Sequence, residues 1–282
     1  MPGEFRFALL AKGRERLGVV GAFHQRFELL LHRARSVGGR QIDSARRDTF
    51  GGLDRQGRAR CDALGQREGS RHQIGHGCMS DKDTGLSAFG HEVVERLNAN
   101  RIMVDLSHSG TQTCLEAARV SKAPISINHT GCRALTDLPR NKSDEELRLV
   151  ASKGGFVGIY FMPFLKSDGH PNAEDVVAHI EHAIDICGED HVGIGTDGSA
   201  TPIDDLAAYR TYLAKQVEDR RKSGLGATGE RADSYPFVVD LRGVDQFRKL
   251  SQLLKARGHT ETRIEKILGL NFLRYARDVW DA

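Results

Sequence analysis

Two histidines follow apolar segments of the sequence in the same way. His108 follows "RIMVDLS" and His129 follows "APISIN", and each is followed by a serine or threonine and then a glycine. Neutral imidazole binds zinc and also transfers protons near neutral pH. A single histidine at a strand end is most often a tolerated structural residue. Two of them on neighbouring strands favour one shared metal or proton-transfer site.

The segments that must position these histidines alternate between strand and helix. Apolar residues at helical spacing predict helices over 85–100, 113–121, 143–155 and 172–188. Short apolar runs predict buried strands at 102–106, 123–128, 155–161 and 191–197. This alternation with short loops is typical of a parallel sheet with helices packed outside it.

Helix-terminating residues support these boundaries. Thr113 with Glu116, and Ser143 with Glu146, have the spacing of capping boxes at the start of two of the helices. Gly188 stands where a glycine commonly ends a helix.

A carboxylate stands in a position similar to that of the two histidines. Asp197 follows the fourth predicted strand, "HVGIGT". In parallel α/β structures, chemistry takes place at the carboxyl ends of the strands. His108, His129 and Asp197 therefore indicate a metal hydrolase centre, and the spacing of the strands fits a (β/α)8 barrel.

Longer motifs make the interpretation specific. The segments "GLSAFGHEVVERLNANRIMVDLSHSG", "APISINH", "LPRN" with "DEELRLV", and "HVGIGTDG" resemble, in this order, the membrane dipeptidase (renal dipeptidase, peptidase M19) family over about residues 73–282. The resemblance implies an α/β fold of the (β/α)8 TIM-barrel metallohydrolase type, of which only the C-terminal half is recognisable here. It also implies a zinc-dependent dipeptidase that hydrolyses the peptide bond of dipeptides through a metal-bound water.

The resemblance assigns roles to four residues. His108 and His129 match the two histidines that bind the second zinc. Arg140, in "LPRN", matches the arginine that contacts the substrate carboxylate and fits that motif better than Arg133 does. Asp197 matches the aspartate beside the zincs, which contacts the substrate and accepts a proton from the bridging water.

A second pair of histidines has a different explanation. His179 and His182 lie three residues apart on a predicted helix, which is also a spacing that metal ligands use. The family has a histidine in this helix without using it as a ligand. We therefore expect both residues to have packing or surface roles.

The resemblance also implies residues that the first part of the chain does not contain. The family binds its first zinc through a His-x-Asp motif and bridges both zincs with a glutamate, and neither is recognisable in residues 1–72. The family has two zincs per site, and the residues seen here support one. If these ligands are missing, the chain as written is expected to hydrolyse dipeptides at least ~10³-fold more slowly than a complete relative. The alternative to a dipeptidase is an inactive relic that binds at most one zinc or a peptide.

The chain divides into two parts. Residues 1–72 are an unmatched segment whose basic residues are all arginine except Lys12. This composition is expected of a disordered arm or of a stretch translated out of frame. Residues 73–282 are predicted to be the C-terminal part of the dipeptidase barrel.

Composition limits the remaining function classes. Five cysteines without a CxxC pair fit a reducing compartment, and no apolar run approaches the ~20 residues of a membrane span. We therefore expect a cytoplasmic protein with no membrane anchor. The arginines are not interleaved with aromatic residues, which argues against nucleic acid as a partner. The expected partner is a dipeptide substrate, and a homodimer is left open.

Overall fold

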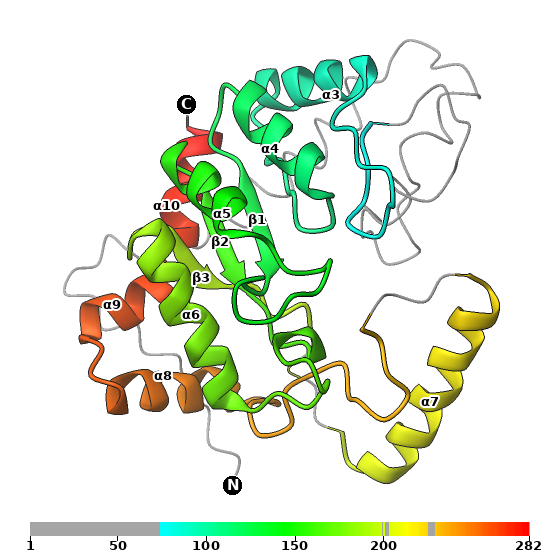
Figure 1. Ribbon diagram of the computed structural model, residues 1–282. Helices are drawn as coiled ribbons and strands as arrows, with labels where there is room; N and C mark the ends of the chain where they lie inside the picture. The colour runs from blue at the N-terminus through cyan, green and yellow to red at the C-terminus, as the bar shows by residue number, and fades with distance from the viewer. Residues whose placement is uncertain (1–73, 199, 201–202, 225–228, 282) are drawn as a thin grey trace, which may run out of the picture. The chain divides into compact units, whose positions relative to one another are not determined.

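The computed structural model describes residues 74–198, 200, 203–224 and 229–281 (Figure 1). The predictions for residues 1–72 lie outside the described residues. In chain order the described elements are α3 (Ala88–Ala99), α4 (Thr111–Val120), β1 (Ser126–Thr130), α5 (Asp144–Ser152), β2 (Phe156–Ile159), η2 (Pro163–Leu165), α6 (Ala173–Cys187), β3 (Val192–Ile194), α7 (Leu206–Lys222), α8 (Gln246–Ala256), α9 (Glu261–Glu265), η3 (Lys266–Leu270) and α10 (Asn271–Trp280).

The three strands form one parallel sheet in the order β1-β2-β3. Figure 1 shows them side by side, with α5 and α6 running along the sheet. Each strand is followed by a helical segment before the next strand begins, as predicted. The carboxyl ends of the strands therefore lie at one edge of the sheet.

The predicted strand at 102–106 is present only as a short contact. Asp105 forms an isolated parallel bridge with Ser126, and the Leu106 N–H donates to the Ser126 carbonyl at 2.8 Å. The segment lies beside β1, so its direction was predicted correctly, but it does not form a regular strand. Among the described residues, β1 is its only strand partner. The two backbone hydrogen bonds that join it to Ser126 of β1 are too few to define a regular strand.

The predicted capping box of α5 is confirmed. The Ser143 side chain accepts from the Glu146 N–H, and the Glu146 carboxylate accepts from the Ser143 N–H. Two backbone donors at the start of the helix are thereby satisfied.

The predicted capping box of α4 is wrong. The helix begins at Thr111, and its N-cap Gly110 makes no side-chain cap hydrogen bond. Asp83, from an earlier loop, accepts instead from the N–H groups of Gln112 (2.6 Å) and Thr113 (3.2 Å). A carboxylate distant in sequence therefore caps this helix, and local spacing cannot reveal it.

The sheet is covered on both faces. Successive residues of a strand point to opposite faces, so Val157 and Phe156 mark the two sides of β2. Val157 belongs to the large core that includes residues of α4, α5 and α6, whereas Phe156 packs with Tyr275 and Val279 of α10. No helix in the described ranges is long and apolar enough to cross a membrane.

Candidate functional site

His108 and His129 lie next to each other at the carboxyl-terminal edge of the sheet. Their ring centroids are 4.9 Å apart, with the ring planes at 76°. His129 is the penultimate residue of β1, and His108 follows the segment that pairs with β1. The structure thus brings together the two imidazoles that the sequence placed at neighbouring strand ends.

The residues just before each histidine hold the two segments together. The Ser107 hydroxyl donates to Asp105 Oδ1 at 2.5 Å and accepts from the His129 N–H at 3.0 Å. The same Asp105 oxygen accepts from the Asn128 N–H at 3.0 Å. Through one aspartate and one serine, the "DLSH" motif therefore ties the segment that leads to His108 to the backbone of Asn128 and His129.

Asp197 joins this pair from the loop after β3. Its Oδ2 lies 3.7 Å from His129 Nδ1 and 3.6 Å from Arg140 Nη2. Its φ is +54°, in the left-handed region that few residues other than glycine adopt and in which asparagine, aspartate and histidine are enriched. A backbone held in this region at a site of convergent polar groups is typical of functional positions.

Arg140 completes the cluster. Its side chain is almost fully buried, its Nη1 donates to His108 Nδ1 at 2.5 Å, and its guanidinium lies 5.7 Å from the centre of the Phe164 ring. Because arginine can only donate, His108 Nδ1 is the acceptor of this bond. Binding of a metal at His108 therefore requires that Arg140 move. Nδ1 is occupied by this bond, and a metal on Nε2 would leave the ring proton on Nδ1, facing the guanidinium donor.

The sequence did not reveal how Arg140 is supported. The Tyr160 hydroxyl donates to Asn141 Oδ1, and Asn141 Nδ2 donates to the carbonyls of Thr136 (2.7 Å) and Phe164 (2.9 Å). Burial raises the pKa of Tyr160, so it remains a hydroxyl donor. The asparagine of "LPRN" was visible in the sequence, but its tyrosine partner lies in another element.

Arg133 and His179, the other arginine and histidine considered from the sequence, make their hydrogen bonds outside this cluster. Arg133 donates to the Asn141 carbonyl and to Thr111 Oγ1 and supports the loop instead. His179 is 2% exposed. Its Nδ1 accepts from the Cys132 N–H and its Nε2 donates to the Leu165 carbonyl, both at 2.9 Å. Burial lowers the pKa of His179, which keeps it neutral. A packing role for His179 is therefore confirmed.

The imidazole pair fits part of a zinc site. Zinc accepts imidazole nitrogen, and catalytic zinc sites usually have three protein ligands. Among the described residues, no group of three or more His, Cys, Asp or Glu side chains is arranged to hold a metal ion. His108 and His129 can supply two ligands, and the third does not come from this part of the chain.

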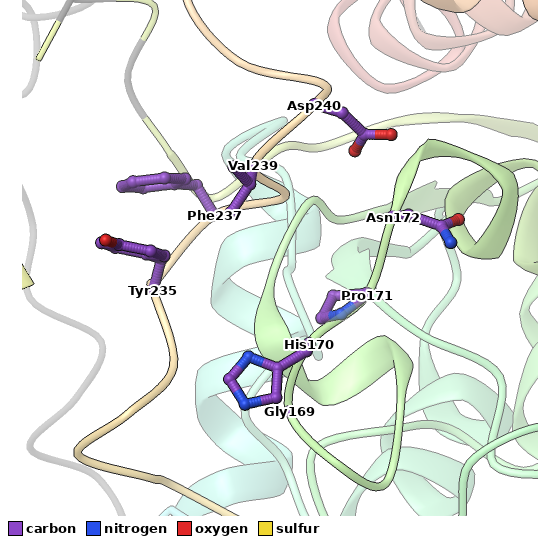
Figure 2. Close-up of a pocket in the computed structure, with 8 residues that line it drawn as sticks. All are labelled: Gly169, His170, Pro171, Asn172, Tyr235, Phe237, Val239 and Asp240. Carbon is purple, nitrogen blue, oxygen red and sulfur yellow. The ribbon is translucent and has the colours of Figure 1, made fainter. Parts of the chain in front are cut away.

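A hollow of about 210 Å³ lies elsewhere, between the loop before α6 and the segment after α7 (Figure 2). The Asp240 carboxylate in its wall accepts from the Ala173 N–H, and Asn172 caps the same helix. His170 Nε2 lies 3.5 Å from Asp233. These polar groups are thus engaged within the fold, and none of the four clustered site residues lines the hollow.

Comparison with known proteins identifies the family. The family model for membrane dipeptidase (peptidase family M19) matches residues 69–223. The dipeptidase verJ of Clonostachys rogersoniana is 34% identical over 179 residues, which are 62% of this chain and 45% of that protein.

Solved structures give the same result. An amidohydrolase from Pseudomonas aeruginosa has a TM-score of 0.62 and 35% identity, covering 74% of this chain and 62% of that one. A metallopeptidase from Rhodobacter sphaeroides, bound to a phosphinate mimic of the dipeptide L-Ala-D-Ala, has a TM-score of 0.56 and 25% identity, covering 73% and 52%.

These likenesses confirm the predicted fold class. The structural neighbours have folds of the TIM-barrel type, and the described residues form part of such a barrel with its parallel sheet. The chain spans less than two thirds of the length of each of these relatives. It belongs to the membrane dipeptidase family, peptidase family M19.

Proposed function

We propose that the described region carries one half of a zinc-dependent dipeptidase site. The observation that carries the proposal is the convergence of His108, His129, Arg140 and Asp197 at the edge of the sheet. These four residues come from separate loops and strand ends. A purely structural role would not require two imidazoles, a guanidinium and a carboxylate to meet there.

Each of the four residues has a role that its chemistry supports. His108 and His129 would hold one zinc ion, which when bound polarises the peptide carbonyl and makes the attacking water more acidic. The planar guanidinium of Arg140 binds the substrate's terminal carboxylate through two parallel hydrogen bonds. Asp197 accepts a proton from the attacking water and returns it to the leaving amine as the peptide C–N bond breaks.

The substrate class follows from the same residues. Arg140 is buried, and its Nη2 lies 3.6 Å from Asp197 Oδ2. A free carboxylate bound to Arg140 would therefore lie close to the aspartate that is proposed to transfer the proton to the leaving amine. This geometry selects short peptides with a free C-terminus. A structural neighbour binds a mimic of L-Ala-D-Ala, which supports a dipeptide. A cytoplasmic location and a homodimer remain predictions from the sequence.

The test is hydrolysis of a dipeptide such as L-Ala-D-Ala with and without zinc. We expect zinc-dependent turnover that is at least ~10³-fold slower than that of a full-length relative, because His108 and His129 alone would hold the zinc and the described residues contain no group of three or more candidate ligands. Asp197→Asn should abolish it, whereas Asp204→Asn, at an exposed aspartate on the same loop, should not. Turnover that is absent with zinc, or unaffected by Asp197→Asn, would contradict the proposal.

A further inference from the structure

A buried ion pair lies next to the site and has no part in the chemistry proposed above. Lys142 Nζ is 3.1 Å from Glu146 Oε1, and the two side chains are 1% and 0% exposed. Burial by itself raises the pKa of Glu146, but the Lys142 ammonium and the Ser143 donors outweigh it, so the pKa lies below its usual value. A buried pair of this kind seldom stabilises a protein more than apolar residues of the same size. Its geometry therefore needs another explanation.

The ammonium of Lys142 is directed at the loop that carries His108. Nζ donates to the Ser109 carbonyl at 2.6 Å and lies 3.1 Å from the Ser109 hydroxyl. Glu146 Oε1 lies within ion-pair distance of Nζ but accepts no hydrogen bond from it, so the hydrogen bonds of the ammonium go to Ser109. The Ser109 carbonyl belongs to the residue immediately after His108, so the lysine fixes the backbone of that histidine.

The main chain of Lys142 is tied to the other half of the cluster. Its N–H lies 3.1 Å from both the Gly131 carbonyl and Thr130 Oγ1, at the end of β1 and directly after His129. Lys142 also follows Arg140 by two residues. One residue thus connects the loop of His108 with the segments of His129 and Arg140.

Glu146 anchors the pair in the framework of the fold. Its Oε2 accepts from the Ser143 N–H and hydroxyl, both at 2.9 Å, within the capping box of α5. The carboxylate is therefore set by the start of α5, and Thr111 Oγ1, three residues after His108, also donates to it at 3.4 Å. It compensates the charge of the lysine at ion-pair distance and so stabilises the buried ammonium beside Ser109.

We propose that Lys142, held by Glu146, is a positioning residue that sets the distance of His108 from His129 and Arg140. The consequence for metal binding rests on the proposed function, whereas the positioning itself does not. Loss of the pair should leave the fold intact but shift His108 away from the Arg140 guanidinium.

The test compares three forms of the full chain. In Lys142→Met/Glu146→Leu, apolar side chains of similar size replace both charges. Because Glu146 also closes the capping box of α5, stability should fall by the loss of that cap, whereas the fold should be retained. Leu254→Ala is the control, because it removes a fully buried side chain from the outer helix α8 and lowers stability without touching the site. The measurements are the ¹⁵N chemical shift of His108 Nδ1, which accepts from Arg140, and the affinity for zinc.

We expect the double variant to lose the hydrogen-bonded Nδ1 shift and to bind zinc ~10- to 100-fold more weakly, the range found when support of metal ligands is removed. The Leu254→Ala variant should change neither value, although it unfolds at lower denaturant concentration. Unchanged His108 shifts and zinc affinity in the folded double variant would overturn the proposal.

Two further outcomes are also decisive. If the parent chain binds no zinc, the proposed function fails, but the His108 shift still tests positioning. If the double variant does not fold, Glu146→Gln replaces it, because the amide keeps the shape of the side chain while removing the charge that holds Lys142. A His108 shift that is unchanged in Glu146→Gln would then overturn the proposal.

Discussion

Replacing His179 with alanine should strongly destabilise the fold although this histidine lies outside the candidate site. The side chain is 2% exposed and bridges the Cys132 N–H and the Leu165 carbonyl. Each buried backbone group left without a partner costs ~1–3 kcal/mol. The cavity left by the ring adds to this. We therefore expect the free energy of unfolding to fall by about 3–5 kcal/mol at neutral pH.

The same helix provides the matched control. His182 lies one turn further along α6 and is half-buried, with its Nε2 2.8 Å from Asp144. A pair of this exposure contributes at most about 1 kcal/mol, so His182→Ala should have a small effect. Urea-induced unfolding, followed by circular dichroism, measures both variants. If His179→Ala lost less than about 1 kcal/mol, or no more than His182→Ala, the bridging role assigned to His179 would be wrong.

Three further predictions follow from the same structure. In a form with measurable turnover, Arg140→Lys should raise KM for a free-acid dipeptide about 10- to 100-fold, since a bidentate charged contact is lost, and should raise KM less for the dipeptide amide. Equal increases in KM for the acid and the amide would indicate a structural role. Because burial lowers the pKa of His179, its contribution to stability is complete above the unfolded value of about 6.5 and is lost as pH falls through the folded value. The stability difference between parent and His179→Ala should therefore shrink between pH 7 and 5, and a constant difference in urea unfolding would contradict this. Burial raises the pKa of Cys114 to about 12, so iodoacetamide should modify it only after unfolding, and rapid labelling of the native chain, seen by mass spectrometry, would refute this.

Much of the fold could be predicted from local sequence patterns. The alternation of short apolar runs with helical spacing predicted β1, β2, β3 and the helices between them. The rule that parallel strands end at one edge predicted that His108, His129 and Asp197 would approach one another. That inference needs only strand direction, which the chain order supplies.

The remaining features depend on contacts between residues far apart in sequence. Asp83 caps α4 from 29 residues away. The sequence around Thr113 therefore does not indicate that the predicted capping box fails to form. The i,i+4 spacing of Lys142 and Glu146 is common on exposed helices, and only the packing reveals that this pair is buried. The Tyr160 hydroxyl reaches Asn141 from the end of another strand. Such cross-element contacts cannot be predicted from spacing alone.

The measurement that tests the central claim most directly is a zinc titration of the full chain and two double variants. His108→Ala/His129→Ala removes the proposed ligands, and His91→Ala/His170→Ala removes two exposed histidines elsewhere. We predict that the parent and the control bind zinc with equal affinity and that the site variant does not bind it. Zinc binding that survives His108→Ala/His129→Ala, or that is absent from the parent, would contradict the account.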